Sequence, residues 1–129
     1  MFSPVHLFSS FAVKDLKQAR NFYSETLGLK VSEDKDMGLL ELKLDGKNRI
    51  MIYPKDDHRP ATYTVLNLVV KNIDDAVEEL DKRGVSFEKY EGFEQEASGI
   101  ARANEYGPSI AWFKDPSGNI LAVLEDKEI

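Results

Sequence analysis

Apolar and polar positions recur in the same order in the two halves of this chain. Residues 11–16 and 68–73 are apolar segments, each interrupted by a lysine and then by a short polar residue. Each segment leads into apolar residues at the spacing of an amphipathic helix: Leu16, Ala19, Phe22, Tyr23 and Leu27 in the first half, and Ile73, Ala76, Val77 and Leu80 in the second. The pattern predicts a strand followed by a helix in each half.

The expected ends of these helices also match. Asp15 and Asn72 stand before them as N-cap residues, whose side-chain oxygens accept hydrogen bonds from the first helical turn. Gly28 and Gly84 follow them, at the position where a helix end favours a residue with left-handed backbone. We expect a short strand after each glycine, at 29–31 and at 85–88.

The remaining segments are typical of strands and turns. In the first half we expect strands at 39–44 and 49–53, a turn at Asp45-Gly46 between them, and a polar linker at 54–60. In the second half we expect a long loop at about 91–108, strands at 110–114 and 120–125, and a turn at 115–118. The whole predicts a single α+β domain, 1–129, made of module 1 (about 5–54) and module 2 (about 61–126).

Composition narrows the classes of partner. The chain has 129 residues, a length typical of one domain, and a net charge of −6. No basic stripe offsets that charge, which argues against nucleic acid as a partner, whereas neutral or cationic small ligands stay compatible. The absence of cysteine excludes disulfides and thiolate metal sites. No signal peptide or apolar run of about 20 residues is visible, so we expect a cytoplasmic protein that does not enter the membrane.

Three motifs together point to a family. They are Val13-Lys14-Asp15-Leu16, then Asn21-Phe22-Tyr23 with Leu27-Gly28, and finally Glu105-Tyr106-Gly107 with the closing run Phe113-Lys114-Asp115-Pro116-Ser117-Gly118-Asn119. The set resembles the vicinal oxygen chelate superfamily, which includes glyoxalase I, extradiol dioxygenases, fosfomycin-resistance enzymes and bleomycin-binding proteins. The resemblance implies two tandem βαβββ modules that form an open half-barrel around a pocket.

The resemblance also implies where metal ligands would stand. Those positions fall at Phe8, Val65, Ala122 and near Met51. None of these side chains is the histidine, glutamine or glutamate of the family's metal enzymes, and methionine is a soft ligand that suits other metals. We therefore expect no metal and no cofactor. His6 shares a strand face with Phe8, so it joins a displaced metal site, lines the rim of the pocket or is simply exposed to solvent.

Strand alternation predicts which side chains face the expected pocket. If Phe11 and Val13 pack beneath the first helix, the alternate residues of that strand face the other way. Trp112 faces the pocket because the resemblance gives its neighbour Phe113 a core position. The expected ligand-binding residues are Phe8, Ser10, Met51, Tyr53, Asn67, Arg102, Tyr106 and Trp112. The alternative is that the apolar members fill the core and the loop members are merely exposed.

Two functions stay open at this point. The first is a small-molecule-binding protein, similar to the bleomycin-binding branch, that takes an apolar, aromatic or cationic ligand and forms a homodimer. The second is a lyase, isomerase or dioxygenase-type enzyme of the same superfamily, either metal-free or with a displaced metal site. No residue is nominated as catalytic. A histidine or glutamate facing inward on two or more strands would favour the enzyme, and an aromatic slot would favour the binding protein.

Overall fold

The chain forms two compact units, Met1–Arg59 (unit 1) and Pro60–Ile129 (unit 2). The computed structural model describes residues 1–43 and 49–127. The boundary between the units falls at the end of the expected linker, 54–60. Within the described residues, no helix is long and apolar enough to cross a membrane.

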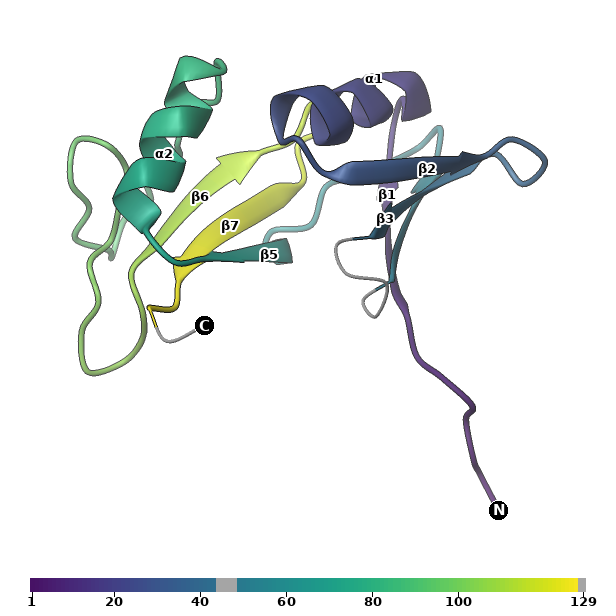
Figure 1. The fold of residues 1–129 in the computed structure, drawn as a ribbon, viewed down its shortest axis with the longest axis horizontal. Helices are drawn as coiled ribbons and strands as arrows, with labels where there is room; N and C mark the ends of the chain where they lie inside the picture. The colour runs from purple at the N-terminus through teal and green to yellow at the C-terminus, as the bar shows by residue number, and fades with distance from the viewer. Residues whose placement is uncertain (44–48, 128–129) are drawn as a thin grey trace. The chain divides into compact units, whose positions relative to one another are not determined.

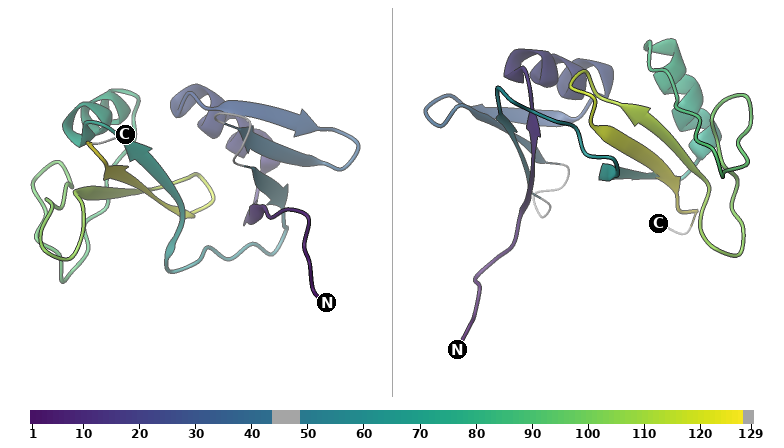
Figure 2. Two further views of the ribbon diagram at one scale, coloured as in Figure 1. Left: turned by 60° about the horizontal axis from the view of Figure 1, so that its bottom comes forward. Right: turned by 180° about the vertical axis from the view of Figure 1, so that it is seen from behind.

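Unit 1 is a four-stranded sheet with helices on one face (Figure 1). Its elements are β1 (Ser9–Val13), α1 (Leu16–Asn21), the π-helix η1 (Phe22–Thr26), β2 (Lys30–Asp34), β3 (Leu39–Lys43) and β4 (Ile50–Pro54). The strand order is β1-β4-β3-β2, with β1 parallel to β4 and the other neighbours antiparallel. Residues 1–8 precede this sheet as an exposed arm (Figure 2).

The local signals at the helix ends are confirmed. Asp15 Oδ1 accepts a hydrogen bond from the Gln18 backbone N–H at 2.9 Å, and Asn72 Oδ1 accepts one from Asp75 at 3.0 Å. Gly28 and Gly84 have φ values of 72° and 89°, which side chains with a Cβ rarely adopt.

The first helix does not continue regularly to Leu27. The Leu27 N–H bonds to the Phe22 carbonyl at 2.9 Å, five residues back, so the last turns widen into a π-helix. The spacing of apolar residues alone does not distinguish this wider turn from an α-helix. The expected turn at Asp45-Gly46 lies outside the described residues.

Unit 2 is a three-stranded sheet with one helix. Its elements are β5 (Thr64–Val70), α2 (Ile73–Lys82), β6 (Ile110–Lys114) and β7 (Ile120–Glu125), in the strand order β5-β7-β6. β5 runs parallel to β7, β6 runs antiparallel to it, and α2 packs against β7 (Figure 1).

The prediction of a strand at 85–88 is wrong. Only Phe87 bridges to the sheet, opposite Phe113, and Glu88 donates one backbone hydrogen bond to Trp112. Beyond this point the ladder stops because the Gln95 side chain binds the Glu88 carbonyl at 2.9 Å and the Tyr90 N–H at 2.8 Å. At the start of the expected strand, the Val85 N–H bonds back to the Leu80 carbonyl at 3.0 Å instead of joining the sheet.

Each unit has its own core between sheet and helix. In unit 1 the core contains Val13, Tyr23, Leu40 and Ile52, all at 0% exposure, together with Phe11. In unit 2 it contains Ile73, Val77, Phe113, Leu121 and Val123, all at 4% or less. The predicted burial of Phe11, Val13 and Phe113 is confirmed.

Candidate functional site

The helix-free face of the unit 1 sheet collects the residues expected there. Since Phe11 and Val13 are buried beneath the helices, strand alternation puts Ser10 on the opposite face. The ladder register aligns Ser10 with Met51 across β1 and β4, and Tyr53 is two residues further along β4 on that face. Tyr53 is 40% exposed, so the face offers an aromatic surface to solvent.

Phe8 extends this face just before β1. Its side chain is 51% exposed. The Arg49 guanidinium lies 5.6 Å from the centre of the Phe8 ring, a cation–π distance. The centres of the His6 and Phe8 rings lie 6.2 Å apart. His6 is exposed beside Phe8, consistent with the rim position considered for it.

Sequence reasoning missed Glu41. It aligns with Met51 on the same face, and its side chain is 13% exposed. Lys43 Nζ lies 3.3 Å from Oε1, and Arg49 Nε lies 3.2 Å from Oε2. Burial raises the pKa of Glu41, but the hydrogen bonds and charges of Lys43 and Arg49 outweigh it, so the net pKa is below the ordinary value.

A sequence signal for Glu41 did exist. It stands between Leu40 and Leu42, both buried in the core, so the period of two places it on the helix-free face. Beside it is a hollow of about 480 Å³ at the β2–β3 end of unit 1. Its lining residues include Glu41, Arg49 and Met51.

The helix-free face of the unit 2 sheet holds a second group. Asn67, Ala122 and Trp112 form one row across β5, β7 and β6. Asn67 is exposed, Ala122 is fully buried and Trp112 is 8% exposed. The row therefore runs from an open amide at the sheet edge to an indole that is almost covered.

Trp112 is covered by aromatic side chains from the preceding segment. The Tyr90 ring meets the indole edge to face at 5.5 Å, and the Phe93 ring lies 4.9 Å away. Phe93 itself is 55% exposed. Burial raises the pKa of Tyr90, whose hydroxyl lacks a hydrogen-bond partner in the described part of the chain. Sequence reasoning missed both rings, because their positions depend on how the loop folds back.

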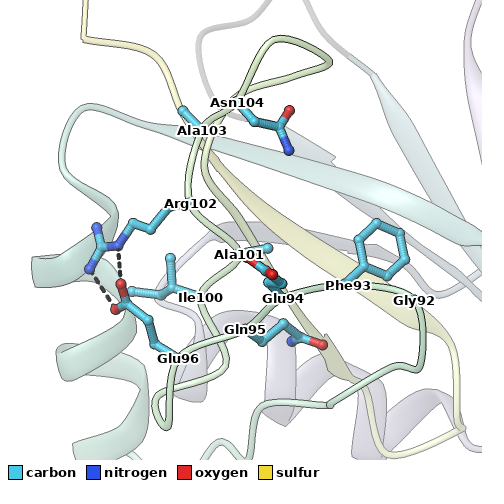
Figure 3. A pocket seen from close by; sticks show the side chains of 10 residues that line it. All are labelled: Gly92, Phe93, Glu94, Gln95, Glu96, Ile100, Ala101, Arg102, Ala103 and Asn104. Carbon is cyan, nitrogen blue, oxygen red and sulfur yellow. Dashed lines mark hydrogen bonds and ion pairs between the residues drawn. The ribbon is translucent and has the colours of Figure 1, made fainter.

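The segment over Trp112 is held in place by Gln95. Besides its bonds to Glu88 and Tyr90, its amide donates to the Gly99 carbonyl at 2.7 Å. The segment also forms a hollow of about 560 Å³, lined by residues 92–96 and 100–104 (Figure 3). Phe93 stands at one side of this hollow and the Arg102–Glu96 ion pair at the other (Figure 3).

Arg102 is engaged within unit 2. Its Nη1 and Nη2 donate to Asp74 at 2.9 and 2.6 Å, and its Nε and Nη2 donate to Glu96 at 2.7 and 2.8 Å. The hydrogen bonds to Asp74 and then Glu96 raise the pKa of Arg102, and those same bonds lower the pKa of both carboxyl groups. Asp74 lies in the first turn of α2, so this arginine ties the loop to the helix.

Tyr106 lies apart from the aromatic cluster. It is 89% exposed, on a tight turn in which Asn104 Oδ1 accepts its backbone N–H at 2.8 Å. The structure therefore brings Asn67 and Trp112 onto one face, while Arg102 is tied to α2 and Tyr106 extends into solvent.

The residues at the expected metal positions do not fit a divalent cation. Phe8, Val65 and Ala122 have no side-chain donor, and Met51 offers only a thioether. Glu41, a carboxylate on the same face as Met51, already has two cationic partners. No cluster of three or more His, Cys, Asp or Glu side chains suited to a metal occurs among residues 1–43 and 49–127.

The fold defines a protein of the glyoxalase-like class. The chain belongs to the Glyoxalase/Bleomycin resistance protein/Dioxygenase superfamily, whose family model matches residues 4–123. The family and the α+β fold class expected from the sequence are confirmed. The sequence matches no curated protein.

Several solved structures share the fold. A superfamily member from Sphaerobacter thermophilus is 25% identical, with a TM-score of 0.70 over 95% of this chain and 98% of its own. A glyoxalase family protein from Bacillus anthracis is 23% identical, with a TM-score of 0.71 over 98% and 100%. TnmS3, described as an antibiotic binding protein from Streptomyces sp. CB03234, is 20% identical, with a TM-score of 0.69 over 96% and 98%.

Proposed function

We propose that this protein binds a small apolar, aromatic or cationic molecule on the helix-free faces of its sheets, without the family's metal. The observation that carries the proposal is the row of Asn67, Ala122 and Trp112 in unit 2. An exposed amide at one end and an aromatic cluster at the other resemble the lining of small-molecule sites, which are mostly apolar with a few placed polar groups.

Each part of the row has a role in this proposal. Aromatic contacts with Phe93 and Trp112 are worth about 0.5–1.5 kcal/mol per pair beyond the area that they bury. Asn67 orients the ligand, because covering its amide without a hydrogen-bond partner costs roughly 1–3 kcal/mol of binding free energy. The fold can support such binding, since TnmS3 shares it and is described as an antibiotic binding protein.

Trp112 fluorescence tests the proposal. Trp112 is the only tryptophan in the chain, so its emission reports on this site alone. Screening aromatic and cationic compounds should give saturable quenching, and Asn67→Leu should weaken the binding of each hit about tenfold, with a melting temperature that is equal or higher. Asn21→Leu, on an exposed position of α1, is the matched control and should leave binding unchanged.

Two results would contradict the proposal. Trp112 emission that no bound compound changes would remove this face from the site, and unfolding of Asn67→Leu would make Asn67 a structural residue. Mass spectrometry of each hit after incubation distinguishes binding from conversion, and a converted compound would favour the enzyme. By the family resemblance we also propose a homodimer, which light scattering would detect as twice 14.6 kDa.

A further inference from the structure

Arg102 in unit 2 and Arg49 in unit 1 differ in how many guanidinium nitrogens are paired with carboxylates. In Arg102, all three nitrogens donate to carboxylates. In Arg49, only Nε is paired, to Glu41 at 3.2 Å, and Nη1 and Nη2 have no partner among the residues that the structure describes. Arg102 is therefore a structural tie, whereas Arg49 keeps the outer edge of its guanidinium available.

Arg49 is also held in a defined position. Glu41 fixes its Nε, and the ring of Phe8 supports the guanidinium plane at 5.6 Å. An arginine side chain normally loses considerable rotamer entropy when it binds a ligand. Here two intramolecular contacts have already restricted the side chain, so less of that entropy remains to be lost.

The ion-paired cluster of Arg49, Glu41 and Lys43 carries a net positive charge, although the whole chain carries −6. Glu41 is shared by two cations, Arg49 and Lys43, so the three groups sum to +1. The adjoining hollow is acidic overall, since Glu33, Asp34, Asp36 and Lys35 line it beside Glu41 and Arg49, and two of its carboxylates are engaged. Glu33 pairs with Arg20 at 3.2 Å, and Asp34 accepts backbone N–H groups of its own turn.

We propose that Arg49, together with Phe8 and Met51, forms a subsite for the carboxylate of an aromatic ligand. The planar guanidinium edge matches two carboxylate oxygens, a geometry that lysine does not reproduce. Met51 and Phe8 provide apolar contacts beside it. This inference rests on the proposed binding function, concerns the helix-free face of unit 1 alone, and assigns to that face aromatic compounds that carry a carboxylate.

Calorimetric titration with 2-naphthoate and its neutral amide, 2-naphthamide, tests the subsite. The acidic protein as a whole repels anions, so a preference for naphthoate reports a local site. Wild type should bind naphthoate about tenfold more tightly than naphthamide. Arg49→Gln should abolish that preference, and Arg49→Lys should restore only part of it. Arg83→Gln makes the same charge change on the exposed end of α2 and should leave the preference intact.

The outcomes separate this subsite from the proposed function. Equal binding of the two compounds, or an unchanged preference in Arg49→Gln, overturns the subsite while leaving the binding function in place. Failure of both compounds to bind also overturns the subsite, and the Trp112 screen then decides the binding function independently. If Arg49→Gln does not fold, as judged by circular dichroism, Arg49→Lys supplies the comparison, and a full tenfold preference in it contradicts the guanidinium assignment.

Discussion

At the scale of single residues, Glu41 shows how a largely buried carboxylate is stabilised on the helix-free face of the unit 1 sheet. A carboxylate that is 13% exposed loses much of its hydration and needs partners. Its two cationic partners are Lys43, on the same strand, and Arg49, directly before β4. Removing one partner of such an ion pair destabilises the protein most, because the remaining charge is then uncompensated.

Glu41 therefore predicts a pH-dependent contribution to stability. Its folded pKa lies below the ordinary value of 4.5, so ionised Glu41 stabilises the fold above that pH, and the contribution is lost as pH falls through the folded pKa. Chemical denaturation across pH 2–7 should show wild type more stable than Glu41→Gln above about pH 4.5, with the two converging in acid. Glu25→Gln, at an exposed position of η1, should show no such divergence. A pH-independent difference would mean that the substitution acts through packing.

At the scale of elements, the segment between α2 and β6 is fixed by side chains where strand ladders are sparse. Gln95 binds three backbone groups, and Arg102 joins the segment to Asp74 at the start of α2. Surface ion pairs contribute little by themselves, whereas leaving partly buried backbone groups unpaired is costly. Gln95 is therefore the stronger of the two anchors, and it positions Phe93 over Trp112.

Gln95→Ala tests this assignment. The change leaves the Tyr90 N–H and two carbonyls without their partner, so the free energy of unfolding should fall by about 1–3 kcal/mol. Phe93 should move away from the indole, and Trp112 emission should shift to longer wavelength in the folded protein. Gln18→Ala, on the exposed surface of α1, should alter stability by no more than about 0.5 kcal/mol. Unchanged emission in folded Gln95→Ala would show that Phe93 does not depend on this anchor.

At the scale of the whole molecule, the chain belongs to a superfamily that includes metal enzymes, but the positions where a metal is expected lack oxygen and nitrogen ligand atoms. The superfamily match covers residues 4–123, yet the positions expected to hold a metal carry apolar side chains. One fold supports several chemistries, and the side chains at the site decide which of them a given chain can perform. For this chain we propose recognition of an organic ligand without the family's metal.

Melting scans with Ni²⁺, Zn²⁺ and Mn²⁺ provide the corresponding prediction. A specific site at about 100 times its Kd would add about 2.7 kcal/mol to the free energy of unfolding. We expect no saturable increase with any of the three, because Phe8, Val65 and Ala122 offer no ligand atom. Protein treated with a chelator is the reference. A saturable, stoichiometric effect would establish a displaced site and reopen the enzyme hypothesis.

The sequence by itself determined the features that depend on near neighbours. The caps at Asp15 and Asn72 act on backbone three residues away, and Gly28 and Gly84 act on their own φ angles. The alternation around Phe113 identified the buried face of its strand. The repeat and its motifs were sufficient for the fold class and the family.

Only the tertiary structure decided the features that depend on distant partners. Arg102 is tied to Asp74, 28 residues away, which no local pattern indicates. The strand expected at 85–88 did not form: the Val85 N–H bonds back to the Leu80 carbonyl, and the Gln95 side chain takes the Glu88 carbonyl. Arg49, which local patterns did not single out, is paired within the described residues only through Nε, to Glu41. Pairing of this kind depends on which groups meet in space, and spacing along the chain does not specify it.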